Sequence, residues 1–190
     1  AKDVIQIQVP KAIGIVVPAE GVRTNDPRMF MRAITSQGDL SWTPIHVVSP
    51  VGSFTSDSSV AFDPPIINVS TGIVINIVPR MNVEINESIS LFLPNLDASE
   101  LPYAIDAKMR CIVLRGAARD ATFNASSSTL TMTVSRNMPR GVMSSVIVPP
   151  TSGIRIHSSG LFPEMRTKIW TNAKDGPIDA GSSFPFVSYG

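Results

Sequence analysis

The sequence predicts an all-β protein. Apolar and polar residues alternate at positions 5–9, 73–77, 89–93 and 130–134, which is the pattern of half-buried antiparallel strands. Pro and Gly interrupt these stretches at roughly 8–12-residue intervals, a rhythm typical of a β-sandwich. Several stretches end in proline, which cannot donate to a ladder and therefore stops the pairing. We expect Ig-like antiparallel β-sandwich modules arranged in tandem.

The chain contains an internal repeat. Four glycines of residues 1–52 recur near the C-terminus: Gly14 as Gly153, Gly21 as Gly160, Gly38 as Gly176 and Gly52 as Gly190. The offset in residue number is 139 for the first two pairs and 138 for the last two. An apolar residue follows the glycine in both copies of the first two pairs. Residues 1–52 therefore read as the C-terminal part of a preceding repeat.

A second, weaker repeat lies within residues 53–190. Positions 73, 75 and 77 match positions 130, 132 and 134 at an offset of 57, and positions 89 and 91 match positions 146 and 148. We therefore predict two β-sandwich modules, residues 53–115 and 116–190, which together make about one repeat unit. The apolar residues expected to face their cores include Ile75, Ile77, Leu91 and Val134.

Residues 1–52 would expose half of a core if they stood alone. They predict an edge for assembly, formed by Ile5, Ile7, Val9, Ile13 and Ile15. Val17 and the apolar residues of the 29–34 stretch need a cover as well. This chain, a preceding segment of a longer polypeptide or a neighbouring subunit must supply the missing strands. Strand donation between neighbours builds a filament, because main-chain hydrogen bonds give affinity and alternating pockets set the register.

The composition argues against some classes of partner. The net charge is +1 and charged residues make up 16% of the chain, without a cluster of Lys and Arg. Binding to nucleic acid through a basic surface is therefore not expected. The apolar runs fall short of the ~18 residues that a membrane span needs. The single cysteine, Cys111, lies in an apolar strand-like run and is expected to be a buried thiol, with an intermolecular disulfide as the alternative.

Three N-x-S/T sequons lie at Asn68, Asn86 and Asn124. Each is an acceptor for an N-linked glycan in a secreted protein, and a glycan requires its asparagine to lie at the surface. Such short motifs also arise by chance in a chain rich in Ser and Thr. Together with the repeats and the low charge, they predict an extracellular glycoprotein, secreted or held at the cell surface.

The residue patterns of enzymes are not found in the sequence. His46 and His157 do not occupy equivalent positions in the repeat, and potential metal ligands do not surround them. Acidic residues are read as solvated surface charge rather than as catalytic pairs or calcium ligands: Asp57, Asp63, Glu84, Glu87, Asp97 and Glu100. We therefore predict a protein that is not an enzyme and that has no catalytic, cofactor-binding or metal-binding residues.

Several segments carry a resemblance to a known group of proteins. Alternating strands that run into Pro are followed by Gly-Ile and later by Tyr-Gly, as in residues 89–94, 148–149, 152–154 and 188–190. This pattern resembles the tandem-repeat extracellular proteins of algae and other protists, including cell-surface fibre glycoproteins and shaft proteins of flagellar hairs (mastigonemes). The resemblance implies β-sandwich modules, glycosylation and assembly of copies into fibres. It implies no catalytic residues.

Three functions compatible with this fold stay open. The leading hypothesis is a structural protein whose modules assemble with copies of themselves into a filament or surface coat. The second is an adhesin or carbohydrate-binding module, in which Trp42 or Trp170 stacks on a sugar; packing is the expected role of Trp170 and of residues 29–31. The third is a viral capsid jelly roll, against which the repeat and the lack of a basic arm both count.

Overall fold

The computed structural model describes residues 6–18, 21–98, 110–113, 115–161, 167–179 and 187–189. Within these ranges the chain folds into β-strands without an α-helix, and nearly every strand pair is antiparallel. Two short 3-10 helices interrupt the strands: η1 (Lys11–Ile13) and η2 (Pro150–Ser152). The prediction of an all-β fold is therefore confirmed.

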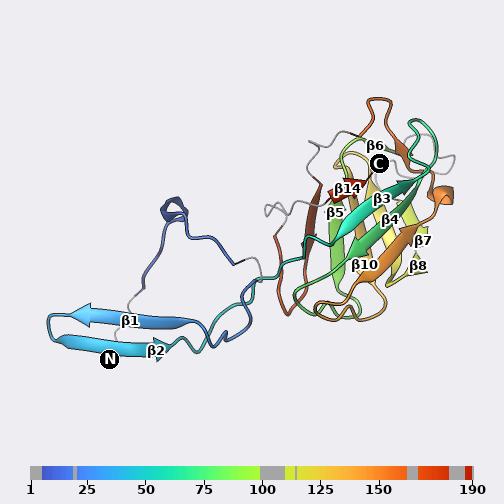
Figure 1. Cartoon of the computed structure of the whole chain (residues 1–190). Helices are drawn as coiled ribbons and strands as arrows, with labels where there is room; N and C mark the ends of the chain where they lie inside the picture. Colours follow the sequence, from blue (N-terminus) through green and yellow to red (C-terminus); the bar gives the residue numbers. More distant parts are fainter. Residues whose placement is uncertain are drawn as a thin grey trace.

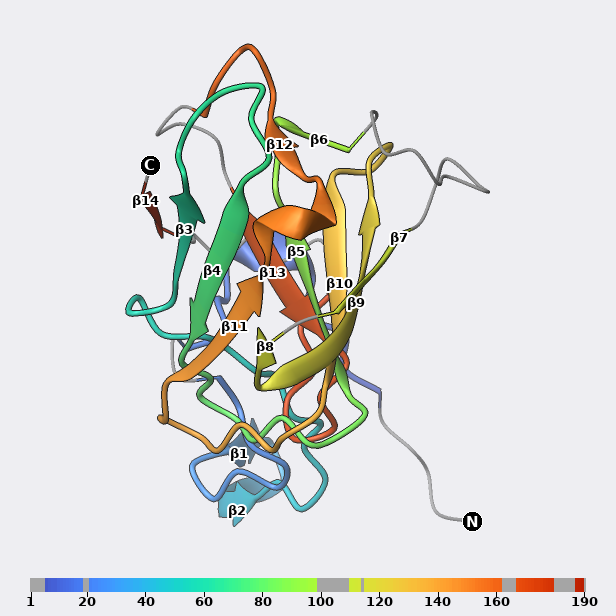
Figure 2. The same cartoon turned by 90° about the vertical axis from the view of Figure 1, so that its right-hand side faces the viewer.

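Two five-stranded sheets face each other across one core (Figures 1 and 2). One sheet has the order β13-β5-β10-β9-β7, formed by β13 (Lys168–Thr171), β5 (Ser88–Phe92), β10 (Thr129–Val134), β9 (Ala118–Asn124) and β7 (Arg110–Val113). The other has the order β14-β3-β4-β11-β8, formed by β14 (Val187–Tyr189), β3 (Ser59–Asp63), β4 (Gly72–Ile77), β11 (Ser144–Val148) and β8 (Arg115–Gly116). The short pair β6 (Leu96–Asp97) and β12 (Arg155–Ile156) lies at one end of this sandwich.

The core forms where the alternating strands turn their apolar sides inward. In β10, Leu130, Met132 and Val134 are buried while the threonines between them are half-buried. The four residues expected to face a core are all fully buried: Ile75, Ile77, Leu91 and Val134. Burial of apolar side chains between two sheets is what holds such a fold together.

The two halves of the weaker repeat are intertwined. The β4–β11 and β5–β10 pairs each join a strand of the predicted first module to a strand of the predicted second. The strand order β3-β4-β11 thereby matches the order β9-β10-β5 in the other sheet, which accounts for the offset of 57. The described parts of residues 53–115 and 116–190 therefore form one sandwich, which corrects the prediction of two separate modules. Each half alone would leave its sheet edges unpaired.

The N-terminal part of the chain lies outside the sandwich. A hairpin of β1 (Phe30–Thr35) and β2 (Gly38–Pro44) projects from one end of it (Figure 1). We call residues 6–48 the arm and residues 144–189 the tail. A strand was predicted over residues 5–9, but residues 6–9 carry no strand pairing, because an alternating sequence forms a strand only beside a partner.

The arm joins the sandwich through a close backbone contact. Val22 and Val51 form an isolated bridge, and the amide of Gly52 donates to the carbonyl of Pro177 over 3.3 Å. The Cα of Gly52 lies where a side chain on Gly176 would begin, so neither position has room for a Cβ. Beside this contact lies a hollow of about 350 Å³, lined by Val22, Arg23, Val51, Arg80, Met81, Asn82, Arg140 and Asp175.

Candidate assembly surface

The arm carries a row of exposed apolar side chains. Ile7, Val9, Ile13 and Ile15 were predicted to form an assembly edge, and all four are exposed, Ile7 and Ile15 at 76%. Ile5 belongs to the same prediction and lies outside the described residues. Burying one such aliphatic side chain is worth roughly 1.5–3 kcal/mol, so a row of them favours association with other apolar groups.

Two turns and one hairpin pairing of the arm repeat those of the tail, and the first of them is a proline-led 3-10 turn. In the arm, the amide of Ile13 donates to the carbonyl of Pro10 over 3.1 Å, and Gly14 follows with φ of 77°. At the equivalent place in the tail, Ser152 donates to Pro149 over 2.9 Å, and the following glycine has φ of 73°. A positive φ strains other residues, so the glycine is required in both copies.

A second turn repeats in the same way. The amide of Gly21 donates to the carbonyl of Pro18 over 2.8 Å, and the amide of Gly160 donates to that of His157 over the same distance. Both glycines have φ of 75°. The repeat found in the sequence is thus also a repeat of local structure, although among the described residues the arm has no second sheet to pack against.

The hairpin of the arm has the register of the corresponding turn in the tail. Ala33 pairs with Leu40 across β1 and β2. In the tail, Thr171 pairs with Ile178 in an isolated antiparallel bridge. Both tail residues stand at the same offset, 138, from their counterparts in the arm. The identical pairing shows that residues 30–40 correspond to β13 and the bend that follows it.

The two copies differ in the exposure of their equivalent apolar side chains. Six apolar tail residues are buried in the sandwich, whereas their counterparts in the arm are exposed: Val146 for Ile7, Val148 for Val9, Ile154 for Ile15, Ile156 for Val17, Ile169 for Met31 and Ile178 for Leu40. For example, Ile169 has no exposed surface and Met31 is 51% exposed. Residues 29–31 were expected to pack, but within the described structure they do not, since the arm lacks the sheet that the tail covers.

The outward positions of the two copies do not share this apolar character. Gln8, Val16 and Ile34 in the arm stand where the tail has Ile147, Arg155 and Asn172. None of these three tail residues is buried. The apolar character is therefore kept at the six buried positions named above, and it varies at these three positions that are not buried.

The sequon asparagines have different surroundings. Asn68 and Asn86 are exposed, and both lie in turns with positive φ. The carboxamide oxygen of Asn86 accepts a hydrogen bond of 2.9 Å from Arg119. Asn124 is half-buried at the end of β9, and its carboxamide oxygen accepts bonds from the hydroxyl and amide of Ser126. Surface exposure therefore favours Asn68 and Asn86 over Asn124 as glycan acceptors.

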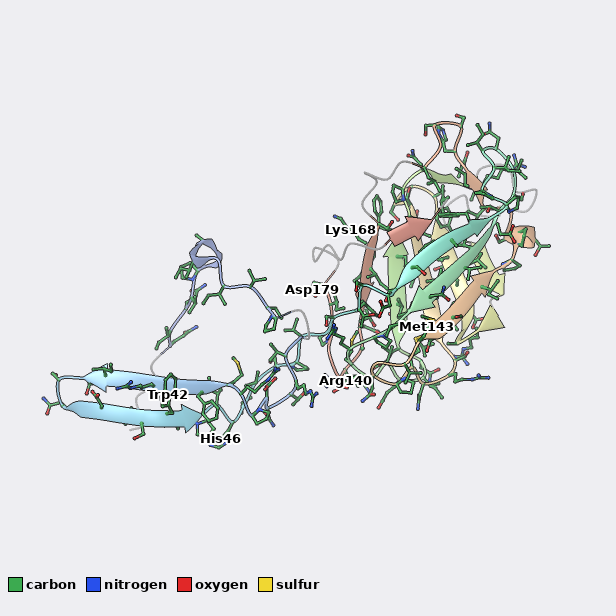
Figure 3. All side chains as sticks on the ribbon, viewed as in Figure 1. Trp42, His46, Arg140, Met143, Lys168 and Asp179 are labelled. Atoms are coloured by element: carbon green, nitrogen blue, oxygen red, sulfur yellow. The ribbon has the colours of Figure 1, made fainter. Side chains whose placement is uncertain are left out.

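The residues considered for binding are dispersed. Trp42 lies on the hairpin and is 67% exposed, and His46 follows β2 in a bend rather than on a strand (Figure 3). Trp170 is half-buried on the outer side of β13 and packs against the core without filling it, because Ile169 and Thr171 take the inward positions. Cys111 pairs with Thr122 through its backbone, and its side chain is outside the described set.

Two carboxylates play structural parts that their sequence context did not indicate. Glu87 is buried, and its two oxygens accept hydrogen bonds from the amides of Glu84 and Lys174, at 2.7 and 2.8 Å. Asp26, at the base of the arm, accepts from the backbone and guanidinium of Arg28, with a shortest distance of 2.7 Å. These hydrogen bonds hold the pKa of Asp26 well below its ordinary value. Only the tertiary contacts identify Glu87 as buried.

The described part of the chain contains no constellation for catalysis or metal binding that we can identify. Among its residues no three His, Cys, Asp or Glu side chains gather in a way that would hold a metal ion. No helix found there is long and apolar enough to cross a membrane. The hollow beside the arm is lined by arginines, an aspartate, an asparagine and apolar residues, without a paired nucleophile and base. Comparison with protein families, curated proteins and solved structures finds no match for this chain.

Proposed function

We propose that this chain is a structural protein whose repeated β-sandwich modules assemble into an extracellular filament or surface coat. One observation carries the proposal: the arm has the turns and hairpin register of the tail, yet it exposes the side chains that the tail buries. A surface of that kind is complementary to strands of another module. On this proposal the partners are further copies of the repeat.

The strand pairing supports Ig-like modules in this array. The order β3-β4-β11-β8 corresponds to the A-B-E-D sheet of an immunoglobulin domain, and β5 and β13 pair as strands C and F do. The strands β10, β9 and β7 extend the second sheet beyond β5. Successive modules of the array would then be spaced by the offset of the internal repeat.

The proposed setting is extracellular, as in the tandem-repeat surface proteins of algae and other protists that the sequence resembles. The exposed sequons at Asn68 and Asn86 support N-linked glycans as part of the mature protein. The prolines that end strands support a role in arrays as well, because they reduce unwanted strand pairing between neighbouring modules.

The test uses material from the source organism. Electron microscopy and gel electrophoresis, with and without glycosidase, give the assembly state and the mass of the native polypeptide. We expect fibres or a coat, a polypeptide far heavier than the 20.4 kDa of this chain, and a mobility shift on deglycosylation. A discrete, unglycosylated particle of 20.4 kDa would refute the proposal.

A carbohydrate-binding role is the second candidate, favoured by the exposure of Trp42 on a projecting hairpin. Aromatic side chains in such positions stack on sugar rings. Binding to a set of immobilised glycans would be measured for the unaltered chain and for Trp42→Ala. Binding that the substitution abolishes would favour this role over a purely structural one.

A further inference from the structure

We propose that the arm completes a second β-sandwich, and that its partner is a half-sandwich equivalent to residues 53–139 that lies ahead of it in the same polypeptide. This inference rests on the proposed function and adds the identity of the partner and the register in which its strands pair with the arm. It also adds the surface of the partner that receives the arm, which we call the seat. The contacts of the tail identify the partner, because the arm has the turns and the hairpin register of the tail.

The tail is held by the open edges of two strands. Val146 and Val148 of β11 stand opposite Ile75 and Ile73 of β4. Ile169 of β13 stands opposite Leu91 of β5. By the equivalence of arm and tail, Ile7 and Val9 would face a strand like β4, and Met31 would face a strand like β5.

The remaining contacts of the tail involve the same part of the chain. The carbonyl of Ile154 accepts a hydrogen bond of 2.8 Å from the amide of Thr71, and Ile156 pairs with Leu96 in the short β6–β12 sheet. Thr71 and Leu96 both belong to residues 53–139. A single half-sandwich of that extent therefore offers a seat for Ile15 and Val17 as well as for the strands of the arm.

Six inward side chains of the arm nearly match the volumes of their buried tail counterparts. Val9 and Ile15 are identical to their tail counterparts, Val148 and Ile154. The other four exchanges stay among aliphatic residues and methionine: Ile7 for Val146, Val17 for Ile156, Met31 for Ile169 and Leu40 for Ile178. The methylene gained at Ile7 is lost again at Val17. Cores tolerate such volume-conserving exchanges, whereas the outward positions of the arm change polarity freely.

Some exchanges require adjustment of the seat. Ala33 and Thr35 stand where the tail has Thr171 and Ala173, which are both buried. Ile13 stands where the tail has Ser152, which is buried. The half-sandwich that receives the arm therefore needs a smaller residue near this turn than this chain has. The predicted edge residue Ile13 would then be covered along with Ile7, Val9 and Ile15.

The order of the chain places the partner ahead of the arm. In the sandwich described here, residues 53–139 lead directly into the segment that contains the tail, and the arm leads directly into Ser53. Since the arm corresponds to the tail, the same order of segments places a half equivalent to residues 53–139 directly before the arm. A second copy of this chain offers no vacant half, because its own tail already covers β4 and β5.

The experiment extends the full chain rather than dividing it. Residues 53–139 are placed ahead of residue 1, which reproduces the spacing of the internal repeat, and hydrogen–deuterium exchange is followed for arm residues 6–17 and 30–44. In the 190-residue chain we expect these amides to exchange rapidly. In the extended chain we expect exchange at least about 100-fold slower, approaching the rate of residues 145–156 and 168–178 in the same molecule.

Matched substitutions separate a specific seat from general apolar association. Ile7→Asp combined with Met31→Asp removes two inward side chains, and Val16→Asp combined with Ile34→Asp removes two outward ones. All four residues are exposed in the 190-residue chain, so neither pair disturbs its sandwich, and unchanged exchange of the tail checks this. We expect the inward pair to abolish the protection of the arm and the outward pair to retain it.

Several outcomes would overturn the inference. They are an arm that still exchanges rapidly in the extended chain, an extended chain that aggregates through its added half, and equal loss of protection in both substituted pairs. Slow exchange in the unextended chain, together with the mass of a dimer, would instead identify a second copy as the occupant. Discrete particles built from a polypeptide much longer than this chain would refute the filament while leaving this result intact, so the two failures are distinguishable.

Discussion

Two isoleucines in matching positions provide the sharpest test of the contrast between arm and tail. Ile15 and Ile154 each follow a glycine with positive φ, and they occupy equivalent places in the internal repeat. Ile154 is 1% exposed and Ile15 is 76% exposed. We expect Ile154→Ala to destabilise the sandwich strongly, and Ile15→Ala to leave its stability unchanged.

The magnitude follows from the buried groups. Removing the carbons beyond Cβ from a buried isoleucine costs about 0.8 kcal/mol each, or roughly 2.5 kcal/mol in total. The cavity left behind raises this toward the middle of the ~2–5 kcal/mol range measured for such changes. For a chain of this size, about 3 kcal/mol lowers the Tm by roughly 6–12 °C. The exposed site should change stability by less than about 0.5 kcal/mol.

Unfolding by urea and by heat, followed by far-UV circular dichroism, measures both variants against the unaltered chain. Equal slopes of the urea transitions would show that only the stability has changed. A loss at Ile15→Ala as large as that at Ile154→Ala would refute the reasoning, because the arm would then be packed. A neutral Ile154→Ala would contradict the burial of the tail.

Three further predictions concern single contacts. Gly176→Ala is expected to lower the free energy of unfolding by about 1–3 kcal/mol, because the new Cβ would lie 2.7 Å from the Cα of Gly52. An unchanged urea midpoint would contradict this close approach. Glu87→Ala is expected to lower the free energy of unfolding by about 1–3 kcal/mol in the same assay, since two backbone amides lose their acceptor. Glu84→Ala, at an exposed site, should lower it by less than about 0.5 kcal/mol. Equal effects of the two substitutions would argue against the buried carboxylate. Titration of Asp26 by NMR should give a midpoint well below 3.8, and Arg28→Ala should raise it. Because the folded pKa is lowered, this contact stabilises the base of the arm fully above the unfolded pKa, and the stabilisation is lost as the pH falls from there through the folded pKa. An ordinary midpoint would count against the ion pair.

The sequence predicted the strands that have a partner within this chain. Residues 73–77 and 130–134 place an apolar residue at every second position, and both form strands that bury these residues. The same alternation over residues 5–9 gave no strand in the described part of that stretch. Alternation reports which side of a strand could be buried, whereas pairing depends on a neighbour that a local pattern does not specify.

The internal repeats were visible in the sequence, but their meaning came from the topology. The offset of 57 suggested two modules in succession. The pairing of β4 with β11 and of β5 with β10 instead interleaves the two halves in one sandwich. A repeat shows that two segments form similar strands, and only long-range hydrogen bonding shows whether each copy closes on itself or on the other.

By itself the sequence determined the all-β class, the long internal repeat and the glycines that the repeated turns need, since alternation and positive φ depend on local chemistry. The tertiary structure alone decided which copy of the long repeat has its apolar residues covered, that Glu87 is buried and that the two halves share a core. Burial depends on segments distant in the chain. For that reason Ile15 and Ile154, with the same glycine before them, differ completely in their exposure to solvent.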